Sequence, residues 1–148
     1  MSGTRNLVLW LHILVAMVSL GPLVLFDMVV PGTVRSGNAG AVRWLSRRVH
    51  VLGPVTVLVA LLGIVLVVRD DHDPYTFSEG WISASLAVYI LMAVNGVAVL
   101  DRTLARAADR LEAGQPADAE AARLRLFGAF NILGLLLILW LMVAKPGQ

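Results

Sequence analysis

Polar side chains that could do chemistry stand inside long apolar segments of this 148-residue chain. Such groups are costly to keep in apolar surroundings, so they are the first place to look for a functional site. His12 could serve as an axial haem ligand or a proton-transfer group. It could equally form a hydrogen bond to a neighbouring helix, with Tyr89 or a serine as its partner. Both interpretations stay open, and His12 and Tyr89 are the candidate cofactor-binding residues.

A second set of polar residues lies deeper, with one residue in each apolar segment. At 1.5 Å per residue, all four fall roughly 18–21 Å from the expected outer edge. Polar side chains at one depth form hydrogen bonds between helices, worth about 0.6 kcal/mol on average. We expect either such bonding or a water-filled or ligand cavity at this layer, which consists of Ser19, Thr56, Asn95 and Asn131.

One carboxylate lies near the inner end of the first apolar segment, facing an arginine-rich connection. An ion pair of Asp27 with Arg47 or Arg48 would neutralise this charge. Two prolines interrupt the apolar segments and remove backbone donors that would reach carbonyls four residues earlier. We therefore expect an ion pair at the inner boundary and kinks at Pro22 and Pro54.

Other kinds of catalytic and metal chemistry find no support in the sequence. The chain has no cysteine, which excludes disulfides, thiolate-bound metals and iron–sulfur clusters. The segment 69–74 (RDDHDP) combines three carboxylates with His72, but its spacing matches no metal motif and its composition favours a solvated acidic turn. No nucleophile–base pair or phosphate loop is present. We assign no catalytic residue and no metal site, which favours a non-enzymatic role.

The elements that position these residues are expected to be membrane-spanning helices. The hydrophobic fraction is 58% and the charged fraction 15%, against roughly 45–50% and 25% in soluble proteins. A span needs about 20 mostly apolar residues, and its backbone must pair internally. The arginines flank apolar spans and form no continuous basic face, so nucleic acid is not the expected partner. We predict one integral membrane domain, 1–148, with spans at about 7–30, 50–68, 81–100 and 127–144.

The basic residues indicate the orientation in the membrane. The connections 31–49 and 101–126 carry four and five arginines, whereas the other side has only Arg5, Arg69 and Lys145. Positive charge favours the cytoplasmic side. We therefore expect both long connections in the cytoplasm and both termini outside, in the inner membrane of a bacterium.

The second long connection is predicted to be helical. Residues 101–113 are helix formers, Gly114 suits a helix C-terminus and Pro116 the start of the next helix. The predicted fold is all-α: an antiparallel four-helix transmembrane bundle with a cytoplasmic helical hairpin extending roughly 15–20 Å between the third and fourth helices. The hairpin is expected to contact anionic lipid heads or to dock a partner.

Small residues mark one face of two of the expected helices. They are Gly53, Thr56, Ala60 and Gly63 in the second, and Gly128, Asn131 and Gly134 in the fourth. Such faces pack closely in membranes. The leading hypothesis is a non-enzymatic accessory protein that packs with itself or with a membrane complex. The alternatives are a haem- or porphyrin-binding redox protein that uses His12, and a small-solute or ion pathway through the deeper polar layer.

Two stretches at opposite ends of the chain carry a resemblance to a known family. The first apolar segment opens with Leu9–Leu14 (LWLHIL) and Ala16, and the last closes with Trp140–Pro146 (WLMVAKP). With four expected spans, the chain resembles a bacterial family of predicted integral membrane proteins of unknown function. The resemblance covers essentially the whole chain and implies a four-span membrane protein without an assigned activity.

A more distant resemblance concerns the first span alone. The position of His12 near its start is similar to that of a histidine in the four-helix, haem-dependent bacterial protoporphyrinogen oxidases and in the membrane domains of copper-resistance proteins. Those oxidases carry a basic residue inside the third helix, and this chain has none between Trp81 and Leu100. The resemblance implies that His12 contacts haem b or a porphyrin.

Overall fold

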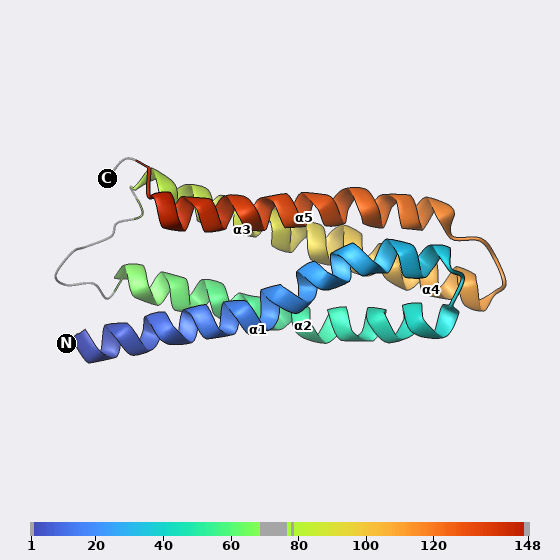
Figure 1. Cartoon of the computed structure of the whole chain (residues 1–148), viewed down its shortest axis with the longest axis horizontal. Helices are drawn as coiled ribbons and strands as arrows, with labels where there is room; N and C mark the ends of the chain where they lie inside the picture. The colour runs from blue at the N-terminus through green and yellow to red at the C-terminus, as the bar shows by residue number, and fades with distance from the viewer. Residues whose placement is uncertain (1, 69–76, 78, 147–148) are drawn as a thin grey trace.

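The computed structural model describes residues 2–68, 77 and 79–146, all of them helical apart from short turns. The helices form four long rods that lie side by side (Figure 1). The first two are α1 (Ser2–Arg35) and α2 (Ala39–Val68). The third is continuous but composite, with α3 (Gly80–Asn95), a π-helix η1 (Gly96–Asp101) and α4 (Arg102–Glu112). The fourth rod is α5 (Asp118–Ala144). The all-α prediction is confirmed.

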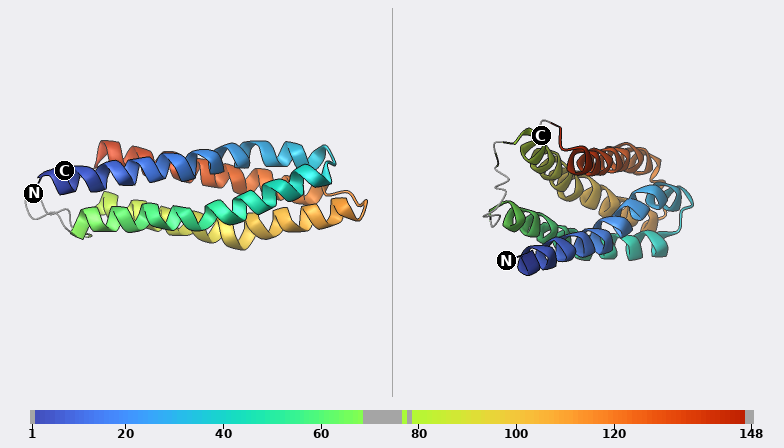
Figure 2. Two further views of the ribbon diagram at one scale, coloured as in Figure 1. Left: turned by 90° about the horizontal axis from the view of Figure 1, so that it is seen from below. Right: turned by 60° about the vertical axis from the view of Figure 1, so that its left-hand side comes forward.

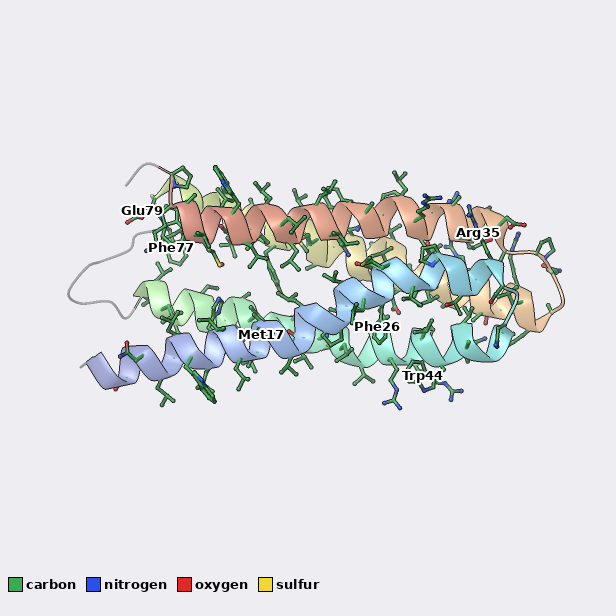
Figure 3. All side chains as sticks on the ribbon, in the orientation of Figure 1. Met17, Phe26, Arg35, Trp44, Phe77 and Glu79 are labelled. Carbon is green, nitrogen blue, oxygen red and sulfur yellow. The ribbon has the colours of Figure 1, made fainter. Side chains whose placement is uncertain are left out.

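All four rods are long and apolar enough to cross a membrane. The candidate spans are Asn6–Arg35, Ala39–Val68, Gly80–Glu112 and Asp118–Ala144, and each contains one of the spans expected from the sequence. Large apolar side chains cover the outside of the bundle, such as Met17 with 70% of its surface exposed (Figure 3). Such an exterior suits lipid and not water, because lipid imposes no penalty on apolar surface.

The chain runs up and down, so neighbouring rods are antiparallel. Both termini lie at one end, which we call the terminus end, and the turns 36–38 and 113–117 lie at the other, the turn end (Figures 1 and 2). At the first turn Gly37 has φ 73° and Asn38 Oδ1 accepts the Ala41 amide at 3.0 Å. At the second, Gly114 has φ 70°. Both glycines supply a left-handed conformation that other residues rarely adopt.

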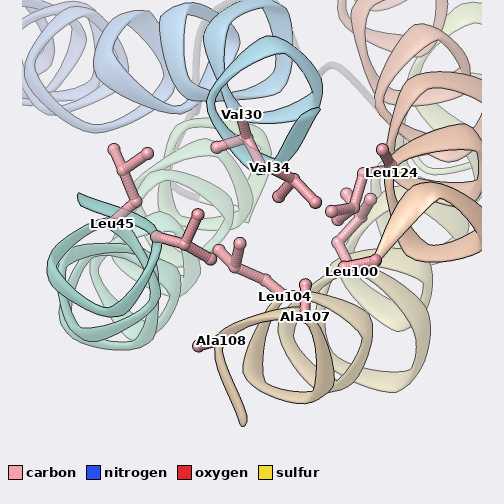
Figure 4. Packing of buried hydrophobic residues seen from close by; sticks show 11 residues of the cluster. Val30, Val34, Leu45, Leu100, Leu104, Ala107, Ala108 and Leu124 are labelled. Atoms are coloured by element: carbon pink, nitrogen blue, oxygen red, sulfur yellow. The ribbon is translucent and has the colours of Figure 1, made fainter. Parts of the chain in front are cut away.

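The buried apolar core lies toward the turn end. Figure 4 shows its side chains converging from all four rods. Leu104, Ala107 and Ala108 of α4 belong to this cluster, so the helix that follows the third expected span lies against its neighbours. The other members are Val30, Val34, Val42, Leu45, Leu100, Ala117, Ala121 and Leu124.

The expected hairpin is therefore not a separate extension in the part of the chain that the structure describes. The physical reason is that α1 and α2 continue well past their most apolar stretches, to Arg35 and from Ala39. Their turn-end halves give α4 an apolar surface to bury. An ionic contact completes this packing, since the Arg43 guanidinium donates to Asp109 Oδ1 at 2.6 Å and to both Glu112 oxygens at 2.8 Å. Arg110 similarly links α4 to Glu120 of α5, at 3.4 Å.

Helix contacts differ between the two ends of the bundle. Helix α1 packs along α2 and α5, and α3 packs along α5, but α2 and α3 touch in few places. The space between them toward the terminus end holds the candidate site. The acidic segment 69–74 lies outside the described residues, so the structure leaves the expected acidic turn untested.

Candidate functional site

A cavity of about 350 Å³ lies between α1, α2, α3 and α5 in the half of the bundle nearer the termini. Its wall is mainly aliphatic and aromatic, with Leu20, Ile64, Trp81, Leu86 and Leu135 among its members. Polar side chains also line it: His12, Ser85, Tyr89 and Lys145. An apolar cavity with a few polar groups is the usual form of a small-molecule site. The two candidate cofactor-binding residues of the sequence analysis thus share one cavity.

The His12 ring is held in place by α2. Its Nδ1 lies 2.9 Å from the Val59 carbonyl oxygen, and because a carbonyl only accepts, Nδ1 carries the hydrogen. In the neutral ring, Nε2 then has a free lone pair. Gly63 makes room for the ring, since a Cβ there would stand 3.2 Å from His12 Cε1. The hydrogen-bond partner of His12 is a backbone carbonyl, and not Tyr89 or a serine as the sequence suggested.

Tyr89 connects α3 with α2. Its hydroxyl donates to Thr56 Oγ1 at 3.3 Å, and Thr56 donates in turn to the Gly53 carbonyl at 2.7 Å. Ser85, one turn earlier on the same helix, donates to the Trp81 carbonyl of its own helix at 2.7 Å. These bonds leave the Ser85 and Tyr89 oxygens with free lone pairs, so each can accept a hydrogen bond from a ligand.

The deeper polar layer is divided between separate groups. Asn95 and Asn131 join α3 to α5, because Asn95 Nδ2 donates to Asn131 Oδ1 at 2.8 Å. Thr56 pairs with Tyr89 instead. Ser19 is fully buried and donates to the Val15 carbonyl of its own helix at 2.7 Å. The expected bonding between helices therefore exists in two places, and Ser19 takes no part in it.

Asp27 joins this layer from α1. Its carboxylate lies near the Asn131 side chain, and among the described residues it forms no ion pair with Arg47 or Arg48. Arg47 is exposed, and the Arg48 guanidinium lies over the Trp44 ring at 5.2 Å from its centroid. The ion pair expected at the inner boundary is therefore not formed. The two arginines follow the exposed side of α2, whereas Asp27 faces α5.

The contact between Asp27 and α5 depends on a glycine that sequence reasoning counted only as a packing residue. A Cβ at Gly128 would stand 3.3 Å from both the Cβ and the main-chain oxygen of Asp27. The absence of a side chain lets α1 and α5 approach closely there. The spacing of Gly128 and Asn131, three residues apart on one helix face, was the available signal.

The side chains available to bind a metal or a ligand at the cavity limit the chemistry that the site can perform. No group of three or more histidine, cysteine or acidic side chains that could hold a metal ion occurs in residues 2–68, 77 and 79–146. The wall offers one imidazole, two hydroxyls, the Lys145 ammonium group and a large apolar surface. This set suits a mostly apolar ligand with few polar groups, or a cofactor that takes one axial nitrogen from the protein.

The fold and the site define a small multi-pass membrane protein built as a four-helix bundle. The chain belongs to the family described as predicted integral membrane protein (DUF2269), whose sequence pattern matches residues 6–146. The match includes all four rods, and the resemblance noted at the two ends of the sequence is confirmed. Comparisons with curated proteins and with solved structures find no match.

Proposed function

We propose that this protein binds an apolar small molecule in the cavity between α1, α2, α3 and α5. The observation that carries the proposal is a cavity of about 350 Å³ whose wall is mainly apolar and carries the polar side chains of His12, Ser85, Tyr89 and Lys145. This volume lies within the roughly 300–1,000 Å³ of typical ligand pockets. A lipid-soluble molecule is the expected class, because most of its surface would contact aliphatic side chains and only one end would need hydrogen bonds.

The small-residue faces support this function over an accessory role that depends on packing against other proteins. Gly63 accommodates His12 and Gly128 accommodates Asp27. A Cβ at Gly134 would stand 2.7 Å from Met92 Sδ. These glycines serve contacts within the chain, so they need no second copy or partner to explain them.

A haem or porphyrin is the more specific candidate ligand, and the geometry of His12 favours it. Metal-bound histidines almost always donate their other ring N–H to a carbonyl or carboxylate, which fixes the ring. The bond from Nδ1 to the Val59 carbonyl does this and leaves Nε2 for an iron atom. His12 thus has the geometry of an iron ligand in a haem b site: it would hold the iron, and the apolar wall would cover part of the ring. The iron would supply one-electron chemistry.

We further propose that the turn end faces the cytoplasm of a bacterium and the cavity faces the outer half of the bilayer. Exposed arginines at the turn end support this orientation by the positive-inside tendency. They are Arg35, Arg47, Arg48, Arg102, Arg106, Arg110, Arg123 and Arg125. Both termini would then lie outside, and this basic end would contact anionic lipid heads.

Extraction of the bound molecule tests the proposed function. The protein is purified in mild detergent, extracted with organic solvent, and the extract is compared by mass spectrometry with that of Ala60→Phe, which fills the cavity. Val57→Phe is the matched control, since Val57 lies on the same helix with 52% of its surface exposed. We expect one molecule to be retained by the wild type and the control and lost from Ala60→Phe. Equal retention in all three would refute the proposal.

Absorption spectroscopy tests the haem candidate separately. Protein expressed with ample haem, and protein titrated with haemin, is measured with and without dithionite beside His12→Ala. A Soret band that shifts on reduction and disappears in the variant is the expected result. A featureless spectrum in the wild type excludes haem while leaving other apolar ligands as the expected class.

A further inference from the structure

A second polar site lies away from the cavity, where α1, α3 and α5 meet. It contains the carboxylate of Asp27, the amides of Asn95 and Asn131 and the Phe127 carbonyl. None of these residues lines the cavity. The site therefore needs an explanation independent of the proposed function.

The hydrogen bonds at this site leave oxygen atoms without donors. Both hydrogens of Asn95 Nδ2 are used, one by Asn131 Oδ1 at 2.8 Å and one by the Phe127 carbonyl at 3.0 Å. Asn95 Oδ1 is buried and has no hydrogen-bond partner in the described chain, and only 7% of the Asn95 surface is exposed. A buried acceptor without a donor is destabilising by about 1–3 kcal/mol, which calls for an explanation.

The main chain adds a further oxygen. Pro31 stands four residues after Asp27 inside α1 and has no N–H to donate to the Asp27 carbonyl. That carbonyl lies against α5, because a Cβ at Gly128 would come within 3.3 Å of it. Asp27 thus directs both its carboxylate and its main-chain oxygen toward the same helix.

Among the described residues, no cation compensates a negative charge on the Asp27 carboxylate. The carboxylate is half-buried and, within the described residues, forms no salt bridge. An uncompensated charge among apolar helices is strongly unfavourable. The oxygen acceptors and one carboxylate, with both hydrogens of Asn95 Nδ2 already used, form a site in which the described residues supply no positive partner.

The π-helix begins directly after Asn95, at Gly96. Single π-turns inside longer helices occur frequently at functional sites. Irregular backbone is tolerated at membrane depth where it serves a site, and ion sites in membrane proteins commonly use carbonyls of interrupted helices. The proline in α1 and the π-turn in the third rod are two such interruptions beside one cluster.

We propose that this cluster binds a small hard monovalent cation, with Na⁺ as the species to test. Carboxylate, amide and carbonyl oxygens are the ligands of hard cations, and the site has no sulfur or imidazole for a softer metal. One carboxylate balances one positive charge, whereas a divalent ion would leave a net charge among apolar helices. The cation supplies the positive partner that Asp27 and Asn95 Oδ1 lack.

Thermal unfolding of the purified protein in detergent tests the proposal. The melting temperature is measured at constant ionic strength while NaCl replaces choline chloride, with KCl as a second series. Because a ligand that binds only the folded state stabilises it, we expect a saturable rise in melting temperature with Na⁺. The rise should be absent in Asp27→Asn, which keeps the shape of the side chain. Asp118→Asn, an exposed carboxylate in the first turn of α5, is the control and should behave as the wild type.

A second variant keeps the test decisive if Asp27→Asn folds poorly. Pro31→Ala restores the N–H that bonds the Asp27 carbonyl within α1 and removes that oxygen from the cation, while favouring the helix itself. We expect several-fold more Na⁺ to be needed for half of the melting shift, with no loss of stability in choline chloride. Identical melting in sodium and choline salts would overturn the proposal, and so would a sodium effect that survives in Asp27→Asn.

Discussion

Leu104 provides the most direct test of how the third rod packs. Only 2% of its surface is exposed, and it lies in the core between α4 and the turn-end halves of α1 and α2. Its neighbours include Ala107, Ala108 and Ala121, whose methyl groups are too short to fill the space left by a leucine. Leu→Ala changes in such surroundings destabilise by about 2–5 kcal/mol. We expect about 3 kcal/mol for Leu104→Ala, or roughly a 100-fold change in the unfolding equilibrium at 1.4 kcal/mol per tenfold.

Unfolding in mixed detergent, followed by tryptophan fluorescence, measures this loss, since the chain has four tryptophans. Leu126→Ala is the control, because Leu126 has 67% of its surface exposed and its truncation should change stability by less than about 0.5 kcal/mol. If residues 101–126 formed a hairpin outside the bundle, the two variants would differ little. Equal effects would therefore refute the packing of α4 described above.

Three further predictions concern other contacts of the bundle. Gly128→Ala places a Cβ 3.3 Å from the Asp27 main-chain oxygen and should destabilise by about 1–3 kcal/mol in the same unfolding assay; an unchanged midpoint would show that α1 and α5 can separate freely. Arg43→Gln removes the ionic hydrogen bonds to α4, so hydrogen exchange at the backbone amides of residues 102–112 should accelerate. Added salt should reproduce part of this acceleration in the wild type. If neither the substitution nor salt changes the exchange rate, Arg43 does not stabilise α4. Gly114→Ala forces an alanine to φ 70° and should cost about 1–2 kcal/mol, measured by thermal unfolding, with Gly3→Ala, which has open space, as the control.

The sequence was sufficient to predict the helical architecture of the membrane-spanning part. Apolar length marks a span because backbone groups must pair inside lipid, and Gly114 marks the end of a helix because it permits a left-handed turn. The same reasoning was misleading beyond residue 100, where the apolar run ends. Whether Leu104 and Ala107 are buried depends on how far α1 and α2 extend alongside them, and local sequence does not contain that information.

Sequence reasoning named two residues that line the cavity, but it did not find their contacts. His12 and Tyr89 do share a cavity, yet the hydrogen-bond partner of His12 is a backbone carbonyl. Every residue has a backbone carbonyl, so the sequence does not show which one will accept this bond. The sequence predicted an ion pair of Asp27 with arginines because the position along a helix gives the depth of a residue in the membrane. It does not give the neighbouring helix that the side chain faces. Asp27 in fact lies against Gly128 of α5, and this adjacency of α1 and α5 is set by the whole bundle.

The π-helix in the third rod means that the two ends of the protein need not share one helical phase. At about 100° per residue, a regular helix would point Asn95 and Leu104 in opposite directions, since they are nine residues apart. In the structure both are buried against the other rods. The wider turns of Gly96–Asp101 absorb the mismatch between them. The π-helix thus lets α3 pack around the cavity and α4 pack in the apolar core with different rotations about the helix axis. A substitution that changes the packing of one half need not rotate the helix in the other half.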